Sequence, residues 1–147
     1  MTRIKTPKSI SEWNSFGKDY LPGHLGLEIL SVKPDELLAR MKVQLNLCAP
    51  NGLLHAASVV ALADTACGYA TINSLPNGAI GHATIELKIN FIGTALEGDV
   101  SCLAKLVHKG RTTQVWDAEV SVDETGKKIA HFRCTQIILW PKGSTQK

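Results

Sequence analysis

Residues 55–72 form an apolar stretch that leaves almost no polar face on a helical wheel. A surface helix is usually apolar along one stripe, because its other side meets water. Here the apolar positions cover nearly every side: Ala56, Ala57, Val59, Val60, Leu62, Ala63, Ala66, Cys67, Ala70 and Ile72. The many alanines favour a helix, and the breaker-rich segment 73–78 (NSLPNG) ends it. We therefore expect a central helix that is buried all round.

Strand patterns fill most of the remaining chain, because apolar and polar side chains alternate in it with a period of two. Strands are expected at residues 27–32, 37–47, 84–91, 99–108, 111–123 and 128–140, with a turn at 93–98. Only a sheet that curls around the central helix would bury all of its faces. The predicted fold class is α+β, with about six antiparallel strands in successive hairpins.

A short N-terminal helix is expected before the first strand. Ser9 or Ser11 can cap it, it carries Trp13, Phe16 and Tyr20, and Pro22-Gly23 would stop it. This helix should lie as a lid on the domain.

The length of 147 residues fits a single domain, and 44% hydrophobic residues are enough to fill its core. The polar segments 1–8 and 141–147 are predicted to be flexible ends. No apolar run reaches the roughly 20 residues that a bilayer requires, and the N-terminus lacks the apolar region of a signal peptide. We therefore expect a cytoplasmic protein without a membrane partner.

Charge and cysteine spacing exclude other classes. The net charge of +3 comes from scattered residues without a basic run, and aromatic residues make up 5%, so nucleic acid is a poor partner. The four cysteines, Cys48, Cys67, Cys102 and Cys134, contain no CxxC pair and are read as free thiols. The histidines show no ligand spacing, and we expect neither a metal nor a cofactor.

Asp64 is a carboxylate in the middle of the most apolar helix. An unpaired buried charge costs several kcal/mol, so something must compensate for it. Thr65, an arginine or a backbone donor would give it a structural role. A partly desolvated carboxylate also binds protons more tightly, as a general base or nucleophile requires.

Three segments around Asp64 occur in a recognisable order. Residues 51–71 read NGLLHAASVVALADTACGYAT, residues 84–99 read TIELKINFIGTALEGD and residues 108–120 read HKGRTTQVWDAEV. Over residues 37–140 the chain resembles the hotdog-fold acyl-CoA thioesterases of the phenylacetate-degradation type. Their pattern is G-x-x-H-G-G, a helix with L-A-D-x-A, then T-x-E-L-x-x-N-F and a G-R hairpin. The two glycines after the histidine are Ala56 and Ala57 here, and the asparagine six residues before it is Ala49.

The resemblance implies an acyl-CoA substrate and roles for several residues. Asp64 would activate water or attack the thioester, and the N–H of Ala56 or Ala57 would donate to the oxyanion. An N–H at a helix N-terminus is unpaired and positive, and it survives the exchange of glycine for alanine. His55 matches the histidine that opens this turn, although a histidine satisfied by the backbone at a helix end is the commoner role. Thr84 matches a residue that holds the attacking water, or is a solvent-facing strand threonine.

Substrate binding is expected at two further places. Asn51 and Gly52 precede the histidine, and Gly110, Arg111 and Thr112 form a turn whose cation and amides could hold the phosphates of CoA. A plain hairpin turn would look the same.

Helix geometry adds an expectation about assembly. Ala56 and Asp64 are eight residues apart, so they lie about 12 Å apart along a helix. They cannot flank one carbonyl, and each site would combine two subunits. We expect a homodimer as the minimal active unit, paired again into a homotetramer. A hotdog enoyl-thioester hydratase or dehydratase and a non-catalytic acyl-CoA binding module remain alternatives.

Overall fold

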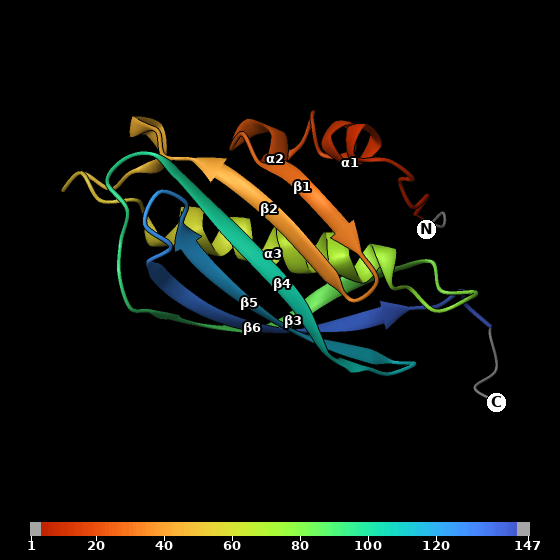
Figure 1. The fold of residues 1–147 in the computed structure, drawn as a ribbon. Helices are drawn as coiled ribbons and strands as arrows, with labels where there is room; N and C mark the ends of the chain where they lie inside the picture. The colour runs from red at the N-terminus through yellow and green to blue at the C-terminus, as the bar shows by residue number, and fades with distance from the viewer. Residues whose placement is uncertain (1–3, 144–147) are drawn as a thin grey trace.

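The computed structural model describes residues 4–143, and its six strands form one antiparallel sheet in the order β1-β2-β4-β5-β6-β3. The strands are β1 (Glu28–Lys33), β2 (Glu36–Lys42), β3 (Gly81–Phe91), β4 (Asp99–Lys109), β5 (Thr113–Val122) and β6 (Lys128–Leu139). The sheet packs against one long helix, α3 (Ala56–Asn73), which crosses behind it in Figure 1. This confirms the α+β class, the strand number and the hotdog arrangement.

Helix α3 is less buried than its sequence suggests. Leu62, Ala63 and Ala66 face the sheet and are fully buried. Ala57 is exposed and Ala61 is half-buried, so a stripe of small residues along α3 is left partly open by this chain. The expectation of burial all round is therefore wrong for the single chain, because the sheet covers only part of the helix.

The N-terminal region contains two short helices instead of one. Helix α1 (Ile10–Phe16) is capped by Ser9, whose hydroxyl accepts from the N–H of Glu12, and it ends at Gly17. Tyr20 lies beyond that end, and Pro22-Gly23 lies inside the second helix, α2 (Leu21–His24). Proline is tolerated in the first turn of a helix, so here it helps to start a helix.

Aromatic side chains join this region to the end of α3. Trp13 is 3% exposed, and its ring centroid lies 5.4 Å from that of Tyr69 on α3. Phe16 meets Tyr69 edge-on at the same centroid distance. The N-terminal helices therefore cover α3 only near its C-terminal half.

Strand β2 ends earlier than predicted. Leu37, Ala39 and Met41 are buried as their alternation requires. Residues 45–47 form a turn of 3-10 helix instead of strand, and Leu45 is 88% exposed. The period of two continues in the sequence by coincidence after the chain has left the sheet.

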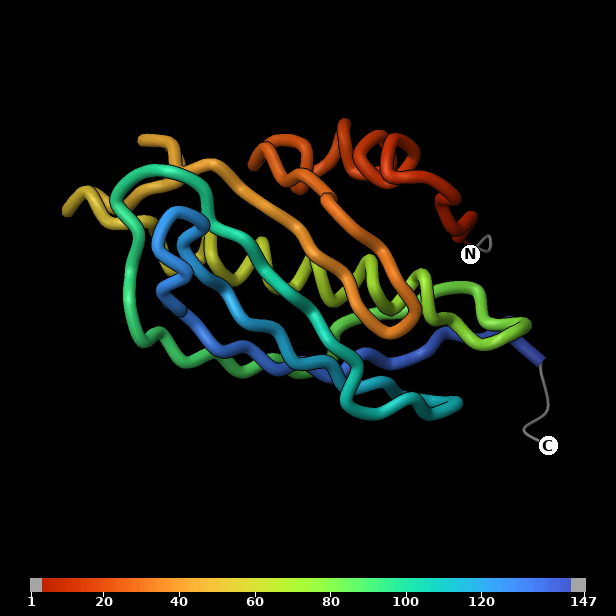
Figure 2. Tube along the Cα trace, viewed as in Figure 1, coloured from red at the N-terminus to blue at the C-terminus, as the bar shows by residue number. Residues whose placement is uncertain are grey.

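The segment Gly93–Gly98 is not a hairpin turn. Strand β3 pairs only with β6, whereas β4 pairs with β2 and β5. In Figure 2 the chain after β3 runs up one end of the molecule and enters β4 in the middle of the sheet. Strand β3 therefore lies at the edge of the sheet, with its outer side unpaired within residues 4–143.

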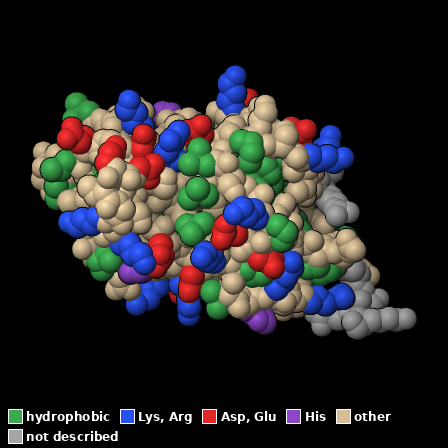
Figure 3. All heavy atoms as spheres, viewed as in Figure 1, with side chains coloured by type: hydrophobic (Ala, Val, Ile, Leu, Met, Phe, Trp, Pro, Cys, Tyr) green, Lys and Arg blue, Asp and Glu red, His purple; other side chains and the backbone are tan. Residues whose placement is uncertain are grey.

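In the face shown in Figure 3, acidic and basic side chains are mixed and hydrophobic ones form small groups. None of the helices in residues 4–143 has the length and hydropathy needed to cross a membrane.

The N–H of Ile4 donates to the carbonyl of Ile80, so the described part of the N-terminal segment is attached to the domain. Residues 1–3 and 144–147 of the predicted flexible ends lie outside the described residues.

All four cysteines are free thiols, as predicted. Cys67 and Cys134 lie in the core between α3 and β6, and Cys102 lies there on β4. Cys48 is the one that is partly exposed.

Candidate active site

Asp64 lies in the middle of α3, on the partly open stripe. Its Oδ1 atom accepts a hydrogen bond from the hydroxyl of Thr84 at 2.9 Å. None of the ion pairs formed within residues 4–143 involves this carboxylate. The arginine partner that would have given Asp64 a structural role is therefore not found in the described chain.

Thr84 faces the helix because β3 contains a bulge. The register with β6 shifts between Thr84 and Glu86, so Ile85 is an additional residue. Before the bulge His82 and Thr84 point toward α3, and after it Ile89 packs against the core. Simple alternation would have turned Thr84 toward solvent.

A buried glutamine lies behind Thr84. Gln136 on β6 is fully buried, and its Nε2 atom lies 3.0 Å from the Thr84 hydroxyl. Its Oε1 atom lies 2.9 Å from Nδ1 of His82. Burial lowers the pKa of His82, against smaller raising effects of the Gln136 hydrogen bond and the charge of Asp64. The His82 ring is therefore neutral at neutral pH.

Gln136 is not among the residues predicted for the site, although the sequence contains a signal for it. The inward positions of β6 run Phe132, Cys134, Gln136 and Ile138, all buried. A glutamine in such an apolar series must find hydrogen-bond partners inside the fold. Its presence there predicts a buried polar network.

The start of α3 offers one unpaired amide. His55 is the N-cap, and its Nδ1 atom accepts from the N–H of Ala57 at 2.9 Å. The N–H groups of Ser58 and Val59 donate to the carbonyl of His55. Within the described residues the N–H of Ala56 has no acceptor, so it is the amide that remains available at the positive end of the helix.

A pocket of about 320 Å³ opens beside this helix start. Its lining is mostly apolar and comes from the loop before α3, from α3 itself, from the end of β3 with the loop after it, and from the start of β6. The side chains include Ala49, Leu53, Val59, Phe91 and Ile129, with Asn51, His55 and Thr94 as polar members. The pocket is therefore suited to an uncharged organic group next to the Ala56 amide.

A second pocket, of about 430 Å³, lies at the other end of α3, between residues 73–77 and residues 109–111. Arg111 stacks on Trp140, with its guanidinium carbon 4.5 Å from the ring centroid. The indole of Trp140 donates to the carbonyl of Arg111 at 3.2 Å. Arg111 is thus held as an exposed cation at the mouth of this pocket.

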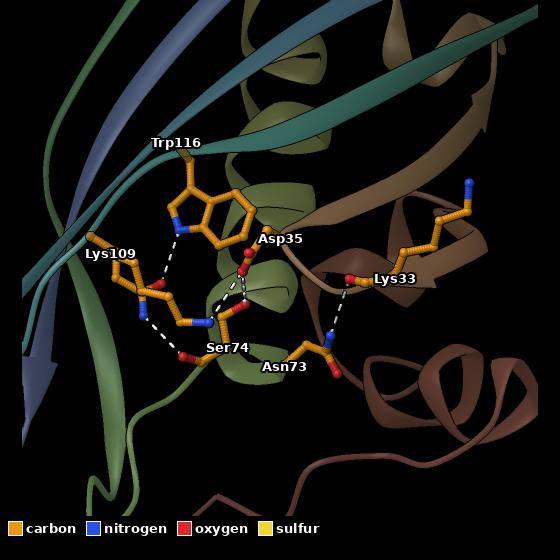
Figure 4. Close-up of polar contacts among 7 residues, drawn as sticks. Lys33, Asp35, Asn73, Ser74, Lys109 and Trp116 are labelled. Carbon is orange, nitrogen blue, oxygen red and sulfur yellow. Dashed lines mark hydrogen bonds and ion pairs between the residues drawn. The ribbon is translucent and has the colours of Figure 1, made fainter.

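Figure 4 shows how the same end of α3 is fixed. Lys109 forms an ion pair with Asp35 at 3.2 Å, and Ser74 donates to the same carboxylate at 3.4 Å. Asp35 has a φ of 60°, which the two-residue turn between β1 and β2 requires. The charge of Lys109 is therefore already paired, and Arg111 is the cation left for an anionic ligand.

The structure does not bring the predicted site residues together in one chain. Asn51, His55 and Ala56 lie at the N-terminal end of α3, where Asn51 Oδ1 accepts from the N–H of Leu53 at 3.1 Å. Gly110 and Arg111 lie at the C-terminal end, and Asp64 lies between the two.

The two remaining predicted residues have backbone roles. Gly52 has a φ of 84°, which a glycine adopts without strain, and nothing lies within 4 Å of the position of a side chain there. The carbonyl of Thr112 accepts from the N–H of Ile138, which ties the β4–β5 turn to β6.

Proteins that are similar to this chain include a thioesterase family and two CoA hydrolases. A family model described as "Thioesterase superfamily" matches residues 51–134. The 1,4-dihydroxy-2-naphthoyl-CoA hydrolase of Listeria monocytogenes is 31% identical over 111 residues, which are 76% of this chain and 89% of that protein. The hydrolase of the same name from Escherichia coli is 31% identical over 126 residues, 86% of this chain and 91% of that one.

A solved structure extends the similarity to the whole fold. The thioesterase HI1161 of Haemophilus influenzae superposes with a TM-score of 0.87 at 25% sequence identity. The match covers 99% of this chain and 100% of that chain, so it includes both ends of α3 and all six strands.

Proposed function

This chain belongs to the thioesterase superfamily and is a thioester hydrolase, and from that membership we propose that it hydrolyses acyl-CoA with Asp64 as the reacting carboxylate. The observation that carries the choice of residue is the environment of Asp64. It is an acid on the partly open stripe of a mainly apolar helix, bound by a neutral hydroxyl and, within residues 4–143, by no cation. A carboxylate paired with a cation would hold its charge as a structural group, whereas this one is free to take a proton or attack.

The chemistry requires two groups at the thioester carbonyl. As a base, Asp64 takes a proton from water while the hydroxide adds to the carbonyl carbon, and the oxyanion is held by the N–H of Ala56. The intermediate then collapses, the C–S bond breaks, and the CoA thiolate receives the proton. As a nucleophile, Asp64 would attack the carbonyl carbon, and the C–S bond would break to release the CoA thiolate and leave a mixed anhydride. Water would then open the anhydride to give the free acid and restore the Asp64 carboxylate. Both routes use the Asp64 oxygen that Thr84 does not hold.

One chain cannot supply both groups to one carbonyl. Eight residues separate Ala56 from Asp64 along α3, which is about 12 Å. A base and an oxyanion donor must each reach within about 3 Å of the reacting atoms. We therefore propose that the Ala56 amide of one subunit acts with Asp64 of a second copy.

The edge strand β3 is the surface that fits this pairing. Its outer side is unpaired within the described chain, and exposed sheet edges recruit another strand. Large hydrophobic side chains along and after it are exposed: Ile85 57%, Leu87 42%, Phe91 46% and Ile92 55%. Pairing of β3 with a second β3 would bury these side chains and bring together the open stripes of two α3 helices. A two-fold dimer gives two equal sites, and a further pairing into a tetramer stays our prediction.

The pocket at the end of α3 supports CoA as the thiol part. Asn73 is nine residues beyond Asp64, about 13.5 Å along the helix axis, a distance that a pantetheine arm can span. Arg111 would then contact the nucleotide phosphates, for which an arginine fork is suited.

The acyl part is less constrained. The two relatives described above are named for a hydroxylated naphthoyl ester, whereas the sequence motifs resemble the phenylacetate-degradation type. We propose an aryl or apolar acyl group of moderate size, because the pocket beside Ala56 is lined mainly by apolar side chains.

A CoA-thiol assay tests this function against both alternatives. The wild type should release free thiol from one or more members of a panel of aryl- and alkyl-CoA esters. Asp64→Asn should lower kcat on the order of 10²-fold or more while substrate binding is retained. Hydration of an enoyl-CoA without thiol release would show the hydratase instead, and tight binding without turnover would show the binding module.

A further inference from the structure

We propose that Gln136 is a positioning residue for Asp64, because its buried amide sets the direction of the hydrogen bond that Thr84 donates to the carboxylate. His82 in turn sets the orientation of that amide. The inference rests on the proposed role of Asp64, and it concerns three residues, His82, Gln136 and Thr84, that are linked to this carboxylate by hydrogen bonds.

The direction of the hydrogen bonds that run from His82 through Gln136 and Thr84 to Asp64 follows from counting protons. An ionised carboxylate only accepts, so the single proton of the Thr84 hydroxyl points to Asp64. The hydroxyl must then accept from Gln136, and of the two amide atoms near it, Oε1 at 3.1 Å and Nε2 at 3.0 Å, only Nε2 can donate. That leaves Oε1 as the acceptor for the Nδ1–H of His82 at 2.9 Å.

The amide of Gln136 has no freedom to flip. Its Nε2 atom carries two protons, and the second lies toward the sulfur of Cys134 at 3.3 Å. Both N–H donors and the carbonyl oxygen of the amide thus have partners at a fully buried position. A flipped amide would present Nε2 to the Nδ1–H of His82 and Oε1 to Cys134, and the hydroxyl of Thr84 would be drawn away from Asp64. Such a reversal is costly where no water can compensate.

Helix α3 is shaped to admit the His82 ring. Gly68 lies one turn after Asp64, and a Cβ atom at this position would be 3.3 Å from Cε1 of His82 and 3.8 Å from its Nε2. A glycine inside a helix makes the helix less stable than an alanine would. The close approach of the His82 ring gives a physical reason for a glycine at position 68. This contact also holds the His82 ring, where the series of hydrogen bonds that ends at Asp64 begins.

As a consequence, the two oxygens of Asp64 have different and fixed roles. Oδ1 is held by Thr84, and the carboxylate plane is set, so the other oxygen is presented to water or to the thioester. A carboxylate that can rotate would sample this orientation only part of the time. Small errors in the placement of a catalytic group cost on the order of 10²-fold in rate.

A second buried glutamine, Gln114, serves as a matched control for the positioning role of Gln136. Gln114 lies directly opposite Gln136 in the β5–β6 register and is equally buried, but it bonds to Trp116 and to the carbonyl of Ser74. Gln136→Met and Gln114→Met each remove a buried amide and should lower the unfolding temperature similarly. Gln136→Met should lower kcat about tenfold to a hundredfold with KM nearly unchanged, whereas Gln114→Met should keep kcat within about twofold.

A double mutant separates positioning from general damage. Once Asp64→Asn has removed the carboxylate, adding Gln136→Met should cause almost no further loss, because coupled residues are not additive. His82→Phe should lower kcat in the same direction by a smaller factor, and it replaces Gln136→Met if that variant does not fold. Equal effects of the two glutamine variants, or full additivity with Asp64→Asn, would overturn the inference. If Asp64→Asn itself keeps full activity, it is the proposed function that fails.

Discussion

The Nδ1 atom of His55 lies 2.9 Å from the backbone nitrogen of Ala57 and accepts its hydrogen bond. This contact uses the Ala57 amide, and it leaves the neighbouring amide of Ala56 without an acceptor in the described chain. Of the two amides that the sequence proposes for the oxyanion, Ala56 is therefore the better candidate. A neutral His55 in this contact carries its proton on Nε2, which makes the ring a second donor beside the apolar pocket.

Ala56→Pro is expected to remove the oxyanion donor and spare the fold. Ala56 is the first residue of α3, where proline is favoured, and His55 before it has φ −66° and ψ 138°, which a following proline accepts. Loss of one such donor should lower kcat on the order of 10²- to 10³-fold. Steady-state kinetics test the rate, and an unchanged unfolding temperature serves as the control. Wild-type kcat in the folded variant would exclude this amide from the site.

Arg111→Ala is expected to weaken binding of CoA without changing the chemical step. A phosphate contact far from the thioester stabilises ground and transition states alike, so KM should rise several-fold at unchanged kcat. The same acyl group on pantetheine lacks the phosphates of the nucleotide, and its KM should not respond. Arg133→Ala is the matched control, because Arg133 is an exposed arginine paired with Asp117 on another part of the sheet. An equal rise in KM for both esters would contradict the assignment.

The stability of the protein should fall in mild acid partly because of His82. Burial lowers the pKa of this ring in the folded state, so below about pH 6.5 the unfolded chain binds more protons than the folded one. Stability is then complete above that pH and is lost as the pH falls toward the folded pKa. Urea unfolding at about pH 7.5 and about pH 5.5 should show a smaller loss for His82→Phe than for the wild type. An identical loss in both proteins would show that the ring titrates normally.

Thiol labelling should distinguish one cysteine from the other three. Burial raises the pKa of Cys102 to about 12, and Cys67 and Cys134 are equally inaccessible to solvent. A thiol reagent should therefore label Cys48 first in the native protein and all four cysteines of the chain only in denaturant. Cys48→Ser should abolish the fast phase. Fast labelling that persists in this variant would mean that the core opens readily.

Much of the fold follows from period and composition. The alanine-rich stretch predicts α3 to within one residue at each end, and alternation predicts all six strands. The crossover at Gly93–Gly98 could not be predicted, because the residues of a turn do not reveal which strand the next one will pair with. The same limit applies to Leu45 and Leu47, whose alternation continues after β2 has ended.

The residue types in the sequence pointed to the candidate site, but they predicted only part of how its side chains are placed in the fold. Asp64 stands out in the sequence because a carboxylate in an apolar helix needs a polar partner. In the structure that partner is the hydroxyl of Thr84, which donates a hydrogen bond to it. The bulge at Ile85 has no sequence signature, yet it alone turns Thr84 toward Asp64. Gln136 could have been found as the polar member of an apolar series, but its link to Thr84 depends on that bulge.

The central claim is that Asp64 of one subunit works with the Ala56 amide of another, and mixing subunits tests it most directly. Asp64→Asn and Ala56→Pro subunits should each be almost inactive as homodimers, but a heterodimer of the two would contain one intact site and one doubly defective site. Differently tagged subunits, refolded together and purified as heterodimers, should show about half of the wild-type activity per dimer. Activity no higher than that of either parent in verified heterodimers, or a fully active monomer of the wild type, would contradict the account.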